Sequence, residues 1–145
     1  MSWVSRELDV KCMRNILRKW NVRYAVLFGS ILQGYGTQLS DLDIAVKLGR
    51  RLSPMELGLL YEELSECFKH TLDLTVLNEA DPILLWEVLV KGKLIYYEDE
   101  SAISEYYYDK AMAIDMICDL EYLLKVFRRE RLRRLQAWKQ EFRGD

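Results

Sequence analysis

The spacing of apolar residues along the chain alternates between a helical and an extended pattern. Apolar side chains recur at every fourth position within residues 5–20, which predicts a helix with one apolar face. The run 22–28 that follows is short, β-branched and aromatic, and predicts a buried strand. The same reasoning predicts strands at 42–47, 72–77 and 94–97.

Helix signals separate the later strands. Ser53, Pro54 and Glu56 are suited to the N-cap, first and third positions of a helix, and together they predict a capping box. A short helix is expected within 81–92. Residues 101–142 contain no Gly or Pro and space their apolar residues by three and four, which predicts one long helix or two with a bend.

Strands that alternate with helices favour the α/β class of folds. A length of 145 residues, half of them hydrophobic, suits one globular domain. We expect a first unit at 1–100 and a helical extension at 101–145 that packs on it. No apolar leader segment precedes the first charges, and no uncharged stretch suits a membrane span, so we expect a soluble, cytoplasmic protein.

Charge is distributed unevenly along the chain. The total is nearly balanced, with 21 basic and 23 acidic residues, but residues 125–145 hold 8 basic and 3 acidic side chains. Three interpretations of this basic segment stay open: a solvated helix face, a docking surface for a partner, and a nucleic-acid contact, which is the least favoured. Apolar residues within the segment favour docking: Leu132, Leu135, Trp138 and Phe142.

The sulfur and imidazole side chains suggest no metal site. Cys12, Cys67 and Cys118 are odd in number and far apart, so we expect neither a disulfide framework nor a zinc knuckle, but small buried thiols in a reducing compartment. The single histidine, His70, is expected near a helix C-terminus, where a partial positive charge is favourable. The tyrosines at 106–108 are expected to pack against the core, with interface contacts and self-modification as the alternatives.

The acidic residues around the second predicted strand are the strongest candidates for chemistry. Asp41 and Asp43 flank Leu42, so both carboxylates lie on one face of the strand while Leu42 faces the core. Two carboxylates this close repel each other unless a cation such as Mg²⁺ lies between them. Asp73, the second residue of the third strand, completes a carboxylate triad if the two strands are neighbours. Two solvated aspartates at a strand edge would also explain the first pair.

The end of the first predicted strand could bind a phosphate. Gly29 allows a phosphate to approach the backbone closely, and Ser30 can cap a short helix whose amide groups and dipole favour an anion. Taken alone, the same two residues are also explained by a simple turn that ends the strand.

Together these features resemble a known signature. Gly29 and Ser30, ten further residues and then Asp41-Leu42-Asp43 resemble the G-S-x10-D-x-D pattern of the polymerase β-type nucleotidyltransferases. The similarity covers about residues 20–98 and is close to the minimal nucleotidyltransferases, including the MntA-type antitoxins that are encoded beside HEPN-domain toxins. It implies a small mixed sheet packed with helices.

The resemblance also implies a division of roles. Asp41 and Asp43 would hold the Mg²⁺ ion that bridges the triphosphate, and Asp73 would join them at a second ion, where it would activate the attacking hydroxyl. The Gly29 amide and the Ser30 hydroxyl would orient the phosphates. The implied reaction transfers AMP from ATP to a hydroxyl and releases pyrophosphate.

One position departs from the family pattern. Gln33 stands where members often carry arginine, and it can hydrogen-bond a phosphate without adding charge. Gln33 and Ser40 complete the expected nucleotide-binding set. The nearest cations in the sequence, Lys47, Arg50 and Arg51, either compensate for the missing arginine or form a solvated basic loop.

Two features missing from the sequence, together with the family resemblance, indicate which molecule accepts the AMP group. The chain has no room for a nucleic-acid clamp, and its one histidine does not form the R-x(4–6)-H motif of HEPN ribonucleases. The resemblance therefore implies a separate HEPN toxin as partner, in a homo- or hetero-oligomer, with one of its tyrosines as acceptor. Two alternatives stay open: a docking module that neutralises its partner by binding alone, and a small-molecule nucleotidyltransferase.

Overall fold

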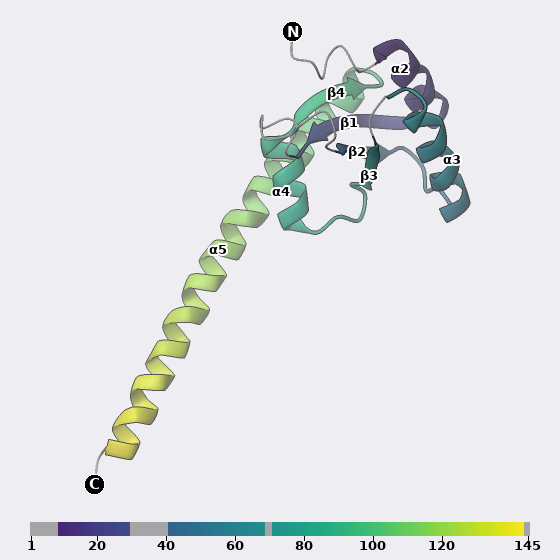
Figure 1. Cartoon of the computed structure of the whole chain (residues 1–145). Helices are drawn as coiled ribbons and strands as arrows, with labels where there is room; N and C mark the ends of the chain where they lie inside the picture. The colour runs from purple at the N-terminus through teal and green to yellow at the C-terminus, as the bar shows by residue number, and fades with distance from the viewer. Residues whose placement is uncertain (1–8, 30–40, 69–70, 144–145) are drawn as a thin grey trace.

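The computed structural model of the chain describes residues 9–29, 41–68 and 71–143 (Figure 1). The elements within them have these bounds: α2 (Val10–Lys19), β1 (Val22–Phe28), β2 (Leu42–Leu48), α3 (Pro54–Ser65), β3 (Leu72–Val76), α4 (Pro82–Lys91), β4 (Lys93–Tyr97) and α5 (Glu100–Arg143). The strands form one sheet in the order β3-β2-β1-β4. The mixed α/β fold expected from the sequence is confirmed.

The strand directions decide which chain ends meet. β1 runs antiparallel to both β2 and β4, whereas β2 and β3 are parallel. The amino-terminal ends of β2 and β3 therefore lie at the same end of the sheet as the carboxyl-terminal end of β1. Phe28, the last residue of β1, is paired with Asp43 of β2.

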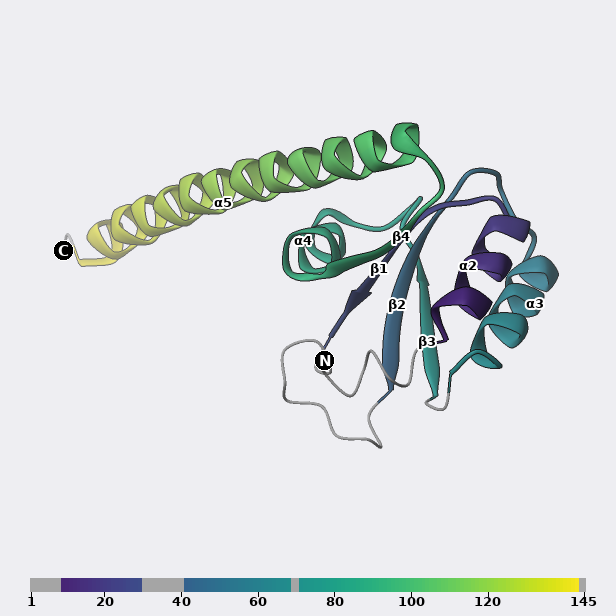
Figure 2. The same cartoon turned by 90° about the horizontal axis from the view of Figure 1, so that it is seen from above.

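Helices cover both faces of the sheet (Figure 2). α2 and α3 lie on one face, and α4 and the first part of α5 lie on the other. Alternate residues of β1 enter the two cores: Ala25 and Leu27 pack with the α2 and α3 side, and Tyr24 and Val26 pack with the α4 and α5 side. Because both of its faces are covered, β1 reads as a nearly continuous apolar run.

The helix starts are fixed by side chains that accept backbone hydrogen bonds. Ser53 accepts from the Glu56 amide at 3.2 Å, and the Glu56 carboxylate accepts from the Ser53 amide at 3.1 Å, which confirms the predicted capping box. Asp9 and Asp81 cap α2 and α4 in the same way, by accepting from amides three residues later. α2 begins at Val10 because the extended residue Asp9 is its N-cap, so residue 9 is not helical, contrary to the expectation; residues 1–8 lie outside the described part of the chain.

The amino-terminal part of α5 is anchored to the sheet by charged side chains. Arg23 on β1 forms ion pairs with Glu98 at 2.9 Å and with Glu105 at 3.0 Å. The Tyr24 hydroxyl donates to Asp109 at 2.6 Å, and burial followed by this hydrogen bond raises the pKa of Tyr24 well above its usual range. Beyond this anchor α5 continues as one helix and extends away from the rest of the chain (Figure 1).

The cysteine expectation is wrong. Cys12 and Cys67 form a disulfide between α2 and the residues after α3, and Cys118 on α5 is exposed rather than buried. The error has a simple cause: α2 and α3 pack on the same face of the sheet, so cysteines 55 positions apart in sequence come together. The spacing of the two cysteines in the sequence does not indicate that they are close in space.

The run of three tyrosines divides between core and surface. Tyr106 is buried, and its ring meets the Tyr24 ring edge-on with 5.4 Å between centroids. Tyr107 and Tyr108 are exposed, so the expectation of core packing is right for the first tyrosine and wrong for the other two. A helix turns 100° per residue, so three consecutive side chains cannot all face one core.

Candidate functional site

Two of the predicted acidic side chains meet at the amino-terminal ends of β2 and β3. Asp43 lies directly opposite Asp73 in the parallel register, which meets the condition that these strands be neighbours. Leu42 is 2% exposed and belongs to the core on the α2 and α3 face, so Asp43 is on the opposite face of its strand. Asp41 immediately precedes β2 and is exposed.

The proximity of these carboxylates and the burial of Asp43 change the pKa of Asp43. Burial raises the pKa of the Asp43 carboxyl to about 6, with further contributions from the negative charge of Asp73, from a hydrogen bond to Asp73 and from the charge of Asp41. Each of these causes disfavours the ionised form. A cation placed between these side chains would relieve this repulsion at neutral pH.

The donor chemistry suits a magnesium ion that is shared with a substrate. Among the described residues, no group of three or more histidine, cysteine or acidic side chains is arranged to hold a metal ion. Two converging carboxylates nevertheless match Mg²⁺, which takes one or two protein carboxylates and completes its coordination with water and substrate phosphates. Asp43 and Asp73 are the residues that would hold it.

Gly29 brings the end of β1 against this acidic pair. Its φ of +90° lies in the region that favours glycine, and a Cβ at this position would overlap the Asp43 carboxylate. Only glycine therefore lets the backbone pass this close to Asp43. The other predicted nucleotide-binding residues lie outside the described part of the chain: Ser30, Gln33 and Ser40. His70 also lies outside it.

The cations considered as substitutes for a loop arginine are far from the acidic pair. Lys47 is four residues further along β2 than Asp43, about 13 Å at the usual rise of a strand. It forms an ion pair with Asp109 of α5 at 3.3 Å, so its charge serves the anchor of that helix. Arg50 pairs with Glu56 at 3.0 Å, and both arginines are exposed beyond the end of β2. Lys47 is therefore not part of a solvated basic loop, whereas Arg50 and Arg51 lie in an exposed segment after β2.

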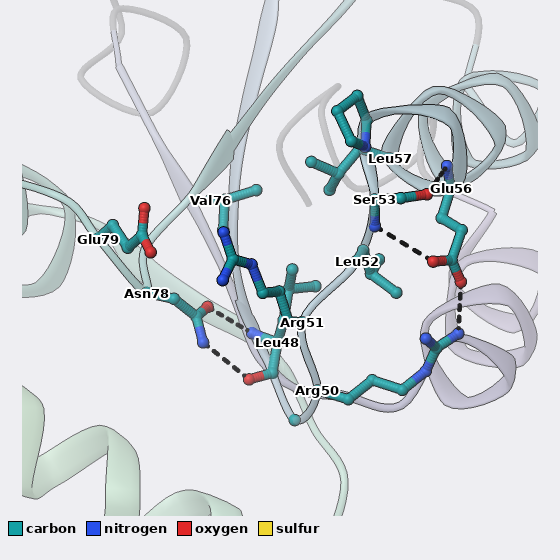
Figure 3. A pocket seen from close by; sticks show the side chains of 12 residues that line it. Leu48, Arg50, Arg51, Leu52, Ser53, Glu56, Leu57, Val76, Asn78 and Glu79 are labelled. Carbon is teal, nitrogen blue, oxygen red and sulfur yellow. Dashed lines mark hydrogen bonds and ion pairs between the residues drawn. The ribbon is translucent and has the colours of Figure 1, made fainter.

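A cavity of about 970 Å³ lies at the carboxyl-terminal ends of β2 and β3 (Figure 3). It is lined by the following residues: Leu48, Gly49, Arg50, Arg51, Leu52, Ser53, Pro54, Glu56, Leu57, Val76, Asn78 and Glu79. The Asn78 amide forms one of its walls, accepting from the Leu48 amide at 2.8 Å and donating to the Leu48 carbonyl at 2.9 Å. Sequence reasoning did not identify this cavity, because its apolar residues follow the ordinary core pattern. It is separate from the acidic pair, at the opposite end of the sheet.

The basic part of α5 extends into solvent. Its apolar residues are largely exposed, with Leu124 at 54% and Phe127 at 65%. The described helices include none that is both long enough and apolar enough to cross a membrane. All three interpretations of this segment therefore apply to a helix face that is exposed to solvent.

Comparison with known proteins agrees with this geometry. The family model described as polymerase beta, nucleotidyltransferase, matches residues 11–101. The protein adenylyltransferase MntA of Shewanella oneidensis is 31% identical over 96 residues, which are 66% of this chain and 68% of that protein. A putative protein adenylyltransferase of Methanocaldococcus jannaschii is 34% identical over 74 residues, which are 51% of this chain and 80% of that protein.

Solved structures show the same fold. A toxin–antitoxin crystal structure with AMP-PNP contains a chain with a TM-score of 0.68 and 23% identity, over 85% of this chain and 98% of that one. The toxin–antitoxin MntA-HepT gives a TM-score of 0.62 with 20% identity, over 83% and 94% of the two chains. The family match spans more than half of the residues and includes Gly29, Asp43 and Asp73. The chain therefore belongs to the polymerase β-type nucleotidyltransferase family.

Proposed function

We propose that this protein is a Mg²⁺-dependent adenylyltransferase that moves AMP from ATP to a hydroxyl group, with a tyrosine of a HEPN-type toxin as acceptor. The observation that supports this proposal most is that Asp43 is paired with Asp73 beside Gly29. The raised pKa of Asp43 is consistent with a position that suits a cation. The names of the two similar proteins, both protein adenylyltransferases, support the transfer of AMP to a protein.

In this proposal each acidic side chain has a distinct role. Asp41 and Asp43 would hold one Mg²⁺ ion, and Asp73 would hold a second ion with them and accept the proton of the acceptor hydroxyl. When bound, Mg²⁺ stabilises the attacking and leaving oxygens of an in-line displacement. The acceptor oxygen bonds to the α-phosphorus, the bond from that phosphorus to the bridging oxygen breaks, and pyrophosphate leaves. We place this reaction in the cytoplasm, where ATP is supplied.

In the proposal, the end of β1 binds the phosphates of the nucleotide. The Gly29 amide lies beside the acidic pair because no side chain separates the backbone from Asp43. In the proposal this amide orients the triphosphate, together with Ser30, Gln33 and Ser40. Of the three cations considered above, Lys47 and Arg50 are ion-paired and Arg51 is exposed beyond the end of β2, so we do not assign any of the three to the triphosphate.

The partner is proposed from the relatives and from α5. The similar solved chains come from toxin–antitoxin complexes. In this chain α5 offers exposed apolar side chains among basic ones, a composition that suits a protein contact. The same surface favours one alternative, a docking module that neutralises its partner by binding without chemistry.

The deciding experiment measures transfer of label from α-labelled ATP to a HEPN-domain protein of the same genome, in the presence of Mg²⁺. We expect label on the partner with the wild-type chain and with Arg51→Ala, an exposed residue at the far end of the sheet. Asp41→Asn and Asp43→Asn should each remove transfer while leaving the fold intact, because they remove charge with little change in volume. A tight complex that never carries label would instead establish the docking module.

A second measurement tests the docking surface. The double variant Leu124→Ser/Phe127→Ser should weaken binding of the partner by about tenfold or more if this face is buried in the complex. Met55→Ser on α3, 79% exposed, is the matched control and should leave binding unchanged. Equal binding by both variants would remove α5 from the interface and leave the transfer reaction unaffected.

A further inference from the structure

A disulfide joins Cys12 to Cys67, and Cys67 precedes Asp73 of the acidic pair by only six residues. Cys12 is in the first turn of α2, and Cys67 is two residues beyond the last residue of α3, with 5.7 Å between their Cα atoms. Both side chains pack with the core on this face of the sheet, and Cys67 is only 7% exposed. The bridge therefore ties α2 to the short connection that leads from α3 into β3.

This connection leads directly to Asp73. β3 begins five residues after Cys67, and Asp73 is its second residue. The Thr71 carbonyl accepts a hydrogen bond from the Leu42 amide at 2.8 Å, which sets the start of β3 against β2. β3 is a five-residue strand at the edge of the sheet, and among the described strands only β2 pairs with it. A tether at its amino-terminal end restrains the end that carries Asp73.

We propose that the Cys12–Cys67 disulfide is a redox-controlled brace that positions Asp73 opposite Asp43. The proposal rests on the function proposed above, because it assigns the brace to the same cation site. Disulfides are uncommon in reducing compartments, where those that do form are usually transient and redox-sensing. The affinity of the site for a metal ion therefore depends on whether the cell keeps this disulfide oxidised or reduced.

Breaking the bond is expected to act locally rather than to release α2. Glu63 of α3 binds the end of α2 independently, accepting from Lys19 at 2.7 Å and from the Trp20 indole at 2.8 Å. These contacts lie away from the first turn of α2, which carries Cys12. Reduction should therefore leave the two helices packed and release Cys67, which precedes Asp73 by six residues.

The chemistry of the switch is thiol–disulfide exchange with a dithiol reductant. A thiolate of the reductant attacks the Cys12 sulfur, the more exposed of the two, and the Cys12–Cys67 bond breaks. The second thiol of the reductant then resolves the mixed disulfide. Two electrons and two protons pass to the chain, which gains two thiols, and the reductant becomes a cyclic disulfide.

The first test counts thiols. Protein purified in air and denatured without reductant should react with one equivalent of a maleimide mass tag, at Cys118, and with three after dithiothreitol treatment. Three equivalents without reductant would overturn the brace at once. Mapping the single tag to Cys12 or Cys67 would do the same, because the bridge would then involve Cys118.

The second test separates positioning from stability. Reduction of the wild-type protein, or the variant Cys12→Ser/Cys67→Ser, should lower Tm by roughly 10 °C, as expected for a bridge that closes a loop of this length. Below both melting temperatures, the same change should weaken Mn²⁺ binding, followed by electron-spin resonance, by about tenfold, the lower end of the roughly 10–100-fold loss that follows when a group that orients a metal ligand is removed. Cys118→Ser is the control and should change neither quantity.

Each outcome has a distinct meaning. A lower Tm with unchanged Mn²⁺ binding would make the bond a structural staple and overturn the positioning role. Dithiothreitol should not change the Cys12→Ser/Cys67→Ser variant, and an effect there would place the redox response elsewhere. Redox-dependent Mn²⁺ binding without transfer of AMP to any acceptor would support the brace and refute the proposed function, so the two can fail separately.

Discussion

The two ends of the β2–β3 pair carry opposite electrostatic arrangements. At the amino-terminal ends, Asp43 and Asp73 face each other and burial with mutual repulsion raises the pKa of Asp43 to about 6. At the carboxyl-terminal ends, Lys47 pairs with Asp109 and Asn78 satisfies both backbone groups of Leu48. The chain thus concentrates its unfavourable interactions at one end, which is typical of a site that binds a charged ligand.

This contrast shows why cavity size alone is a poor guide to the site. The cavity of about 970 Å³ lies at the end where charges are paired or exposed to water. The acidic end is recognised by strand register and by a glycine whose Cβ would overlap a carboxylate. Substitutions at the two ends should therefore have different effects on transfer and on stability.

The largest expected effect is at the acidic end. Asp73→Asn should reduce AMP transfer by roughly 10³-fold or more, because it removes a proposed ligand and proton acceptor while keeping the shape of the side chain. Initial rates with saturating ATP and Mg²⁺ measure this loss. A rate within a few-fold of the wild type would remove Asp73 from the proposed mechanism.

The next effect concerns the backbone beside the acidic pair. Gly29→Ala should destabilise the fold by about 1–3 kcal/mol, since the new Cβ meets the Asp43 carboxylate at a positive φ. Gly58→Ala is a matched control: it lies within α3 with nothing within 4 Å of a Cβ, and should stabilise by about 0.5–1 kcal/mol. Urea unfolding measures both. Equal and small effects would mean that β1 does not approach Asp43 closely.

The sequence predicted local features well because they depend on neighbours along the chain. The bounds of β1 and the capping box at Ser53 follow from alternation and capping chemistry. The meeting of Asp43 and Asp73 was predicted only on condition that their strands are neighbours, which the register shows. Features that depend on how distant elements pack were missed. The Cys12–Cys67 bond and the pairing of Lys47 with Asp109 each join residues on separate elements, and no local pattern indicates such contacts.

A smaller effect of opposite sign is expected for Asp43. Its carboxyl binds a proton more tightly in the folded state, so its own contribution to the stability of the metal-free protein should fall as pH rises from about 4 to about 6 and stay lower above that range. Asp43→Asn should therefore stabilise the metal-free protein at pH 7.5 by about 1–2 kcal/mol, after allowance for solvent screening, and give little change at pH 4. Urea unfolding with a chelator at both pH values tests this, and a variant less stable than the wild type at pH 7.5 would contradict it.

The smallest effect on AMP transfer should come from the other end of the sheet. Asn78→Ala removes two hydrogen bonds to the Leu48 backbone and should cost about 1–2 kcal/mol of stability, while AMP transfer keeps its wild-type rate below the unfolding transition. Glu79→Ala, at the next exposed position of the cavity rim, is the control and should change neither quantity. The expected separation rests on distance, since coupling usually fades between sites more than about 10 Å apart that share no partners. If Asn78→Ala slowed transfer as much as Asp73→Asn, the two ends would act as one site, and the cavity would have to be included in the mechanism.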